Sequence, residues 1–174
     1  MASSQTTQLP DARLVVTGHT PTGTSIFTSD SILPPFAPFG LESSHFTTFH
    51  ASPTVPASNT APYPTLDAVL PRCPPTGVLF CITDIQPGGS APMHRTQSID
   101  YAVVLSGEIV LALDGGEEKT VKAGEFMVQR GVNHAWHNRT EEVCRIACVM
   151  AGTEKIVLED GKVLEQTVFG RKAE

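Results

Sequence analysis

Residues 88–100 read GGSAPMHRTQSID, and this stretch decides the fold expected for the chain. A glycine pair suited to a tight turn comes first, followed by His94 and then by Asp100 at the start of an apolar run. A second stretch, residues 131–138, reads GVNHAWHN and carries His134. Each stretch joins a turn to a strand-like segment, so we expect a site assembled from two separate strands.

Residues 99–105, IDYAVVL, read as a strand, in which successive side chains point to opposite faces. If Ala102 and Val104 face the core, Asp100 faces it with them. His94 and Thr96 each lie an even number of residues before Asp100. The same rule therefore predicts that all of them point inward.

The second stretch has a similar pattern. His134, Trp136 and Asn138 share one face, and His137 takes the other. Two imidazoles and a carboxylate meeting inside a barrel would form a facial site for a divalent metal, with water or substrate in the open positions.

The rest of the chain predicts further short strands separated by Gly and Pro, which number 14 each. Strands at this even spacing favour an all-β barrel or jelly roll. Asp114-Gly115-Gly116 and Glu159-Asp160-Gly161 are hairpin signals. The predicted strands are Arg13–Thr17, Thr24–Thr28, His45–Phe49, Val78–Ile85, Ile99–Leu105, Glu108–Leu113, Thr120–Lys122, Glu125–Gln129, His134–Asn138, Val143–Met150, Lys155–Leu158 and Lys162–Val168.

The chain divides into two parts by composition. Residues 1–76 are rich in Pro, Ser and Thr, and we expect an irregular N-terminal arm with edge strands that belongs to the same domain. A single helical turn is expected at Thr65–Leu70. Residues 77–170 are more regular and are expected to form the barrel core.

Charge and composition argue against several classes of partner. The net charge is −6 with no basic stripe, so we expect no nucleic acid and no membrane surface as partner. The polar residues 1–9 lack a signal-peptide core, which favours a cytoplasmic location. The four cysteines lack the short paired spacing of zinc sites and are expected to be small buried hydrophobes.

The two histidine stretches resemble the paired motifs of the cupin superfamily. The first cupin motif is Gly, five residues, His-x-His, three or four residues, Glu, six residues, Gly; the second ends in Gly, two residues, His, three residues, Asn. The matching positions are Gly88, His94, Asp100, Gly107, Gly131, His134 and Asn138. The resemblance covers roughly residues 77–150. It implies a double-stranded β-helix (cupin or jelly-roll barrel), often dimeric, with a metal held by His, His, Glu and His.

The chain departs from this pattern at two ligand positions. Thr96 stands where the second His belongs, and Asp100 replaces the Glu. Two alternatives stay open: a divalent transition metal (Zn, Fe, Mn or Ni) bound by His94, Asp100 and His134, or acid–base catalysis by the same three residues without a metal.

Four further residues are expected to contact a substrate. Trp136 shares a face with His134, and Thr96 and Asn138 fall within the two motifs. Arg130, at a strand end where the barrel mouth would lie, would pair with a substrate carboxylate. Arg95 is expected to face away from His94, on the surface.

A barrel does not by itself fix a reaction. The leading hypothesis is a lyase or isomerase that decarboxylates, dehydrates or shifts a proton in a small oxygenated metabolite, with the secondary-metabolite context implied by the cupin resemblance. The alternatives are an Fe(II)-dependent dioxygenase and a non-catalytic small-molecule-binding protein. A homodimer is expected, in which the N-terminal arm pairs with the partner.

Overall fold

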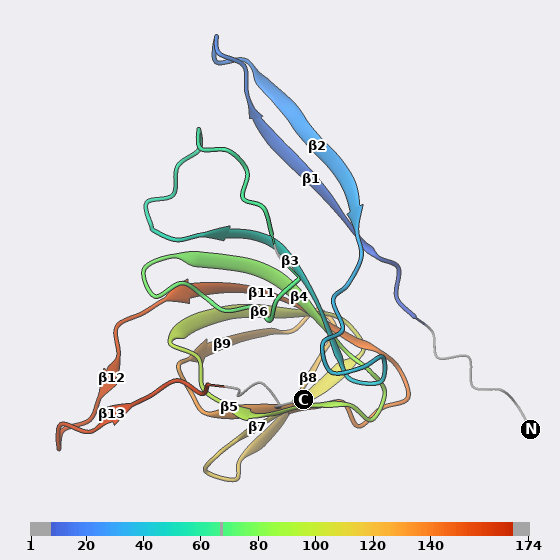
Figure 1. Ribbon diagram of the computed structural model, residues 1–174. Helices are drawn as coiled ribbons and strands as arrows, with labels where there is room; N and C mark the ends of the chain where they lie inside the picture. The colour runs from blue at the N-terminus through green and yellow to red at the C-terminus, as the bar shows by residue number, and fades with distance from the viewer. Residues whose placement is uncertain (1–7, 67, 169–174) are drawn as a thin grey trace, which may run out of the picture.

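Two antiparallel sheets face each other in the computed structural model, which describes residues 8–66 and 68–168 (Figure 1). One sheet has five strands in the order β3, β4, β11, β6, β9, and the other has four in the order β5, β10, β7, β8. From β4 onward the chain passes repeatedly from one sheet to the other. The expected all-β, double-stranded β-helix architecture is confirmed.

The strands are short, as the frequent Gly and Pro residues predict. The five-stranded sheet consists of β3 (Ser44–Ser52), β4 (Val78–Ile85), β6 (Ser98–Ser106), β9 (Phe126–Arg130) and β11 (Cys144–Gly152). The four-stranded sheet consists of β5 (Ser90–His94), β7 (Glu108–Leu113), β8 (Glu118–Lys122) and β10 (His134–His137). Two hairpins are separate, β1 (Ala12–His19) with β2 (Ser25–Leu33) and β12 (Ile156–Val157) with β13 (Val163–Leu164).

Strand β5 is missing from the prediction. Its sequence contains Pro92 and lacks the β-branched residues that mark a strand. β5 is the edge strand of its sheet, where a missing backbone donor is tolerated.

The core lies between the sheets and follows the predicted alternation. In β6, Asp100, Ala102 and Val104 are buried, whereas Tyr101 and Leu105 are each 53% exposed. The bulkiest fully buried aliphatic side chains are Ile85, Val104, Ile109 and Ile146. Burying each such side chain stabilises the fold by roughly 1.5–3 kcal/mol.

Both predicted hairpin turns occur. Gly116 and Gly161 adopt positive φ angles of 87° and 79° in the turns that join β7 to β8 and β12 to β13. A side chain would strain either backbone, which explains the glycine at each position.

The N-terminal arm contributes to the barrel and also projects from it. β3 forms one edge of the five-stranded sheet, next to β4. The β1–β2 hairpin extends away from the two sheets (Figure 1). Together with the irregular segment after β3, the arm therefore builds one side of the molecule.

Two predictions concern the end of the N-terminal arm and the end of the barrel core. The helical turn at Thr65–Leu70 is wrong for its described residues, which are not helical; residue 67 lies outside the described residues. Pro64 and Pro71 flank this segment, and a helix of one turn is too short to be stable by itself. Residues 169 and 170 of the predicted core also lie outside the described residues. Within the described ranges, no helix is long and apolar enough to cross a membrane.

Candidate active site

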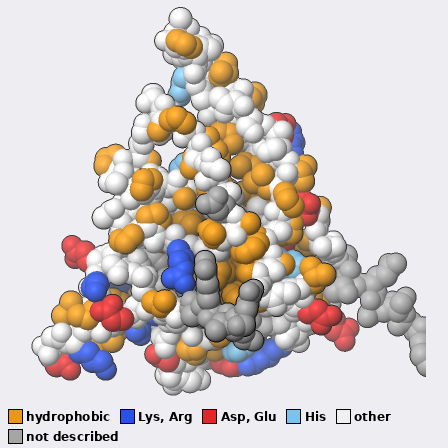
Figure 2. All heavy atoms as spheres, viewed as in Figure 1, with side chains coloured by type: hydrophobic (Ala, Val, Ile, Leu, Met, Phe, Trp, Pro, Cys, Tyr) orange, Lys and Arg blue, Asp and Glu red, His pale blue; other side chains and the backbone are white. Residues whose placement is uncertain are grey.

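A cavity of about 270 Å³ lies between the two sheets, and segments before β4 and after β13 close its sides. Figure 2 shows hydrophobic side chains gathered over the middle of one face of the molecule, with a basic side chain at their edge. The cavity wall includes Phe39, Ser44, Phe46, Arg72, Cys73, Cys81, His94, Arg95, Thr96, Asp100, His134, Trp136, Cys148, Met150, Gln166 and Thr167. His94, Asp100 and His134 thus meet in one cavity.

The two imidazoles lie side by side on the four-stranded sheet. His94 ends β5 and is the register partner of His134, which begins β10. Their ring centroids are 4.4 Å apart, and the rings are tilted by 49°. Directly opposed residues of antiparallel strands share a face, so the ladder itself brings the two histidines together.

Backbone carbonyl groups fix the tautomer of both rings. Nδ1 of His94 lies 2.7 Å from the Pro92 carbonyl oxygen, and Nδ1 of His134 lies 3.0 Å from the Val132 carbonyl oxygen. A carbonyl oxygen can only accept, so each Nδ1 carries the hydrogen and donates it. In the neutral rings, Nε2 is then the nitrogen with the lone pair.

Burial makes His134 a neutral imidazole. It is one of the largest fully buried side chains of the protein. Burial, and to a smaller extent the nearby His94, lower the pKa of His134 to about 4, against the opposing effect of the hydrogen bond to Val132. At neutral pH, His134 therefore presents an unprotonated Nε2.

Asp100 reaches the cavity from the opposite sheet. It lies in β6, where its Oδ1 accepts a 2.5 Å hydrogen bond from the Ser98 hydroxyl and its Oδ2 a 3.3 Å bond from the Thr96 hydroxyl. Burial raises the pKa of Asp100, while the two hydroxyl groups and His94 act to lower it. The carboxyl group is thus held in place by its own strand and by the loop before it.

The comparisons with known proteins agree with this architecture. Residues 81–150 match the family model described as a cupin domain. The chain is 36% identical over 173 residues to phomopsin biosynthesis cluster protein C' of Diaporthe leptostromiformis, which covers 94% of this chain and 92% of that protein. This chain belongs to the cupin superfamily. The resemblance seen in the sequence is confirmed.

Other relatives of this cupin match over shorter stretches. It is 36% identical over 92 residues to the cupin-domain-containing oxidoreductase virC of Hypocrea virens, which covers 51% of this chain and 47% of that protein. Among solved structures, the polyketide cyclase RemF from Streptomyces resistomycificus overlaps with a TM-score of 0.45 and 20% identity, over 74% of this chain and 73% of that one.

The residues of this cupin do not fit the metal site that the family motif implies. Thr96 replaces one imidazole, and its hydroxyl donates to Asp100. Within residues 8–66 and 68–168, no group of three or more His, Cys, Asp and Glu side chains is arranged to hold a metal ion. The ligand set of His94, Asp100 and His134 stays a prediction, and in the structure the Asp100 oxygens accept hydrogen bonds from the hydroxyl groups of residues 96 and 98.

Two of the four predicted substrate contacts lie in the cavity wall. Trp136 and Thr96 line it, and the Trp136 ring centroid is 5.6 Å from that of His134. Arg130 and Asn138 do not line it.

The predicted roles of Arg130 and Asn138 are corrected by their surroundings. Arg130 lies on the exposed face of β9. Asn138 is fully buried below the sheet, where its Nδ2 donates to the carbonyl oxygens of Ile85 and Glu142. Its Oδ1 accepts from the backbone and side chain of Thr140. A side chain with these bonds stabilises a turn, and its amide group has no donor or acceptor left for a substrate.

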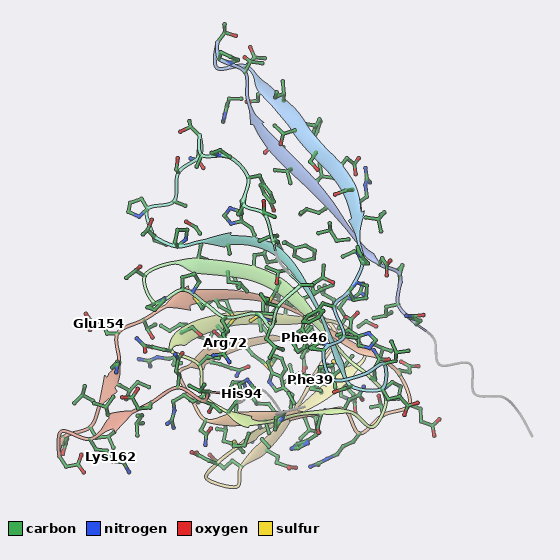
Figure 3. All side chains as sticks on the ribbon, viewed as in Figure 1. Phe39, Phe46, Arg72, His94, Glu154 and Lys162 are labelled. Carbon is green, nitrogen blue, oxygen red and sulfur yellow. The ribbon has the colours of Figure 1, made fainter. Side chains whose placement is uncertain are left out.

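Other residues of the wall were missed by the sequence reasoning. Arg72, Phe39 and Phe46 come from the arm, and Arg95 lies between β5 and β6. Figure 3 shows Arg72, His94 and Phe39 on the inner side of the two sheets. Strand parity cannot be extended to Arg95 because β5 ends at His94, and no motif marks the arm residues.

Three cysteines also line the cavity, but burial keeps them as thiols. Burial raises the pKa of Cys73 to about 11 and that of Cys81 to about 12, and it raises the pKa of Cys148 further. The thiolate is the nucleophile and the metal ligand, so these side chains act as apolar wall at neutral pH.

Proposed function

We propose that this cupin is an enzyme of secondary-metabolite biosynthesis that acts as a lyase or isomerase on a small oxygenated molecule. The observation that carries the proposal is the state of His134. Its Nδ1 is bonded to a backbone carbonyl group, and burial keeps the ring neutral beside a cavity. A neutral imidazole with its lone pair on Nε2 is suited to accept a proton from carbon.

The proposed step begins with a C–H bond next to a substrate carbonyl group. His134 takes the proton at Nε2, and the electron pair of the C–H bond moves toward the carbonyl oxygen to form an enolate. Return of this proton from His134 Nε2 to another carbon completes an isomerisation, whereas its transfer to a leaving β-hydroxyl group, which departs as water, completes a dehydration. The His94 ring lies beside this base, with its centroid 4.4 Å from that of His134, and lines the cavity where the substrate binds.

The names of the relatives support a biosynthetic role. Two are phomopsin biosynthesis cluster proteins, and a third is named oryzines biosynthesis cluster protein J. Several others are named cupin-domain-containing oxidoreductases. The test of function therefore also measures oxygen consumption, which separates the dioxygenase alternative from proton transfer.

The proposal is tested by hydrogen exchange. The protein is incubated in D₂O with a panel of aryl ketones and aryl keto acids, and NMR follows loss of the proton next to the carbonyl group. We expect exchange by the wild-type protein to fall roughly 100- to 10,000-fold in the His134→Gln variant, the usual effect of removing a general base.

The matched control is His137→Gln, because His137 is next to the site in sequence but does not line the cavity. It should retain full exchange. Equal exchange by wild type and His134→Gln would contradict the proposal. Consumption of O₂ that depends on added Fe(II), without exchange, would support the dioxygenase alternative, and binding without either reaction would support the binding protein.

A further inference from the structure

The charged groups on the cavity wall are predominantly basic, although the whole chain has a net charge of −6. The wall holds two arginines, Arg72 and Arg95, and one carboxylate, Asp100. Both oxygens of Asp100 already accept hydrogen bonds from Thr96 and Ser98. The balance of charge at this site therefore favours an anion.

The two arginines differ in what they contact. Nε of Arg95 donates to the Gly131 carbonyl oxygen at 3.0 Å, and its guanidinium lies 4.0 Å from Asp114. Arg72 is exposed at the cavity and has no ion pair or hydrogen bond with any residue that the structure describes. Its guanidinium keeps all its donors for a ligand, and a guanidinium matches a carboxylate bidentately.

An aromatic wall lies beside this cation. Phe39 and Phe46 pack edge to face with their ring centroids 6.4 Å apart and line the cavity together with Trp136. Figure 3 shows Phe39 and Phe46 close together on the side of the cavity formed by the arm. Aromatic side chains arranged in this way favour a flat apolar group.

Two buried polar atoms on the wall also lack partners. The Trp136 indole N–H and the Ser44 hydroxyl make no hydrogen bond within the described part of the chain, and the two residues are 8% and 3% exposed. A buried donor without a partner is costly, so an acceptor atom of a ligand would relieve it. The cavity volume of about 270 Å³ suits one small molecule.

We propose that the cavity selects small aromatic carboxylates, with Arg72 as the residue that recognises the carboxylate group and Phe39, Phe46 and Trp136 as the wall for the ring. This inference rests on the proposed function, since it names the substrate class for the same cavity. It assigns the specificity for an acid to the N-terminal arm rather than to the barrel strands.

The test compares an acid with its neutral analogue. Trp136 is the single tryptophan of the chain, so its fluorescence reports on the cavity directly. Phenylacetate and phenylacetamide are titrated into the wild-type protein and the Arg72→Gln, Arg72→Lys and Arg130→Gln variants. Arg130→Gln removes the same charge from the outer face of β9 and is the matched control.

We expect the wild-type protein to bind phenylacetate about tenfold more tightly than phenylacetamide, as a charge-assisted hydrogen bond to a carboxylate predicts. Arg72→Gln should abolish this preference, Arg72→Lys should retain part of it, and Arg130→Gln should leave it unchanged. Rising salt should weaken phenylacetate binding to the wild-type protein more than it weakens binding to the Arg72→Gln variant.

Three results would overturn the inference: equal affinity of the wild type for acid and amide, an unchanged preference in Arg72→Gln, or no binding of either compound. None of them depends on turnover. A failure of the proposed function would instead show in the exchange experiment, where His134→Gln would match the wild type.

Discussion

Acid should destabilise this cupin through one buried side chain, His134. In the folded protein its pKa is about 4, below the ordinary value of 6.5, with burial as the main cause. Between these two pH values the unfolded chain binds a proton at this residue and the folded protein does not. The unfolded state is then favoured, so the stability supplied by the neutral ring is complete above pH 6.5 and is lost as pH falls toward 4.

The magnitude follows from the difference in pKa. A pKa that changes from 6.5 to about 4 differs by about 2.5 units, and each unit corresponds to about 1.36 kcal/mol. The free energy of unfolding should therefore fall by about 3 kcal/mol between pH 7 and pH 4 on account of His134. This is a large part of the total stability of an ordinary domain.

Urea unfolding followed by far-UV circular dichroism at several pH values measures the effect. Other groups titrate in the same range, and Asp100 with its raised pKa acts in the opposite direction. The quantity to compare is therefore the pH slope of wild type against that of His134→Gln, which cannot titrate. Between pH 7 and pH 4, the free energy of unfolding of the variant should fall by about 3 kcal/mol less than that of the wild type, whatever the stability of the variant at pH 7.

His137→Gln is the control, since His137 is only partly buried and lies outside the cavity wall. It should keep the slope of the wild type. If His134→Gln and the wild type lose stability in parallel as the pH falls, the reasoning about the buried neutral imidazole is refuted.

Three more predictions concern stability and assembly. Asn138→Ala should lower the free energy of unfolding by about 3 kcal/mol in urea titrations, because it leaves buried backbone groups without their partner. Arg145→Met should cost about 3 kcal/mol in the same assay, since the bidentate 2.7 Å pair with Asp84 is largely buried, and unchanged stability would disprove that role. The expected homodimer should appear as twice the chain mass in light scattering, and Phe27→Lys on the exposed strand β2 of the N-terminal arm should shift the mass toward the monomer. A wild-type monomer at micromolar concentration would contradict the dimer.

Most of the strands were predictable from local chemistry. The Gly residues at 116 and 161 mark the hairpins because only glycine adopts their positive φ without strain. The even spacing of Asp100, Ala102 and Val104 along one strand places Asp100 on the inward face. β5 escaped the prediction because a short edge strand with a proline carries little periodic signal. The spacing of the two motifs was sufficient to identify the family, since it depends on the lengths of the turns and strands of one barrel.

The site was predictable only in part. Parity was counted from His94 to Asp100 as though one strand held both, but β5 ends at His94 and Asp100 lies in β6 of the facing sheet. Their meeting is therefore a result of how the two sheets stack. Asn138 and Arg130 fit the pattern of the motif and its turn, yet Asn138 is hydrogen-bonded to backbone groups and Arg130 is exposed on β9.

The sequence by itself determined the strand class, the hairpin turns and the inward face of Asp100 in its strand, because each depends on residues within a few positions of one another. Only the tertiary structure decided the neutral state of His134, the hydroxyl partners of Asp100 and the place of Arg72 at the cavity. Burial and charge at a site depend on segments that are distant along the chain, and no local pattern encodes which of them will meet.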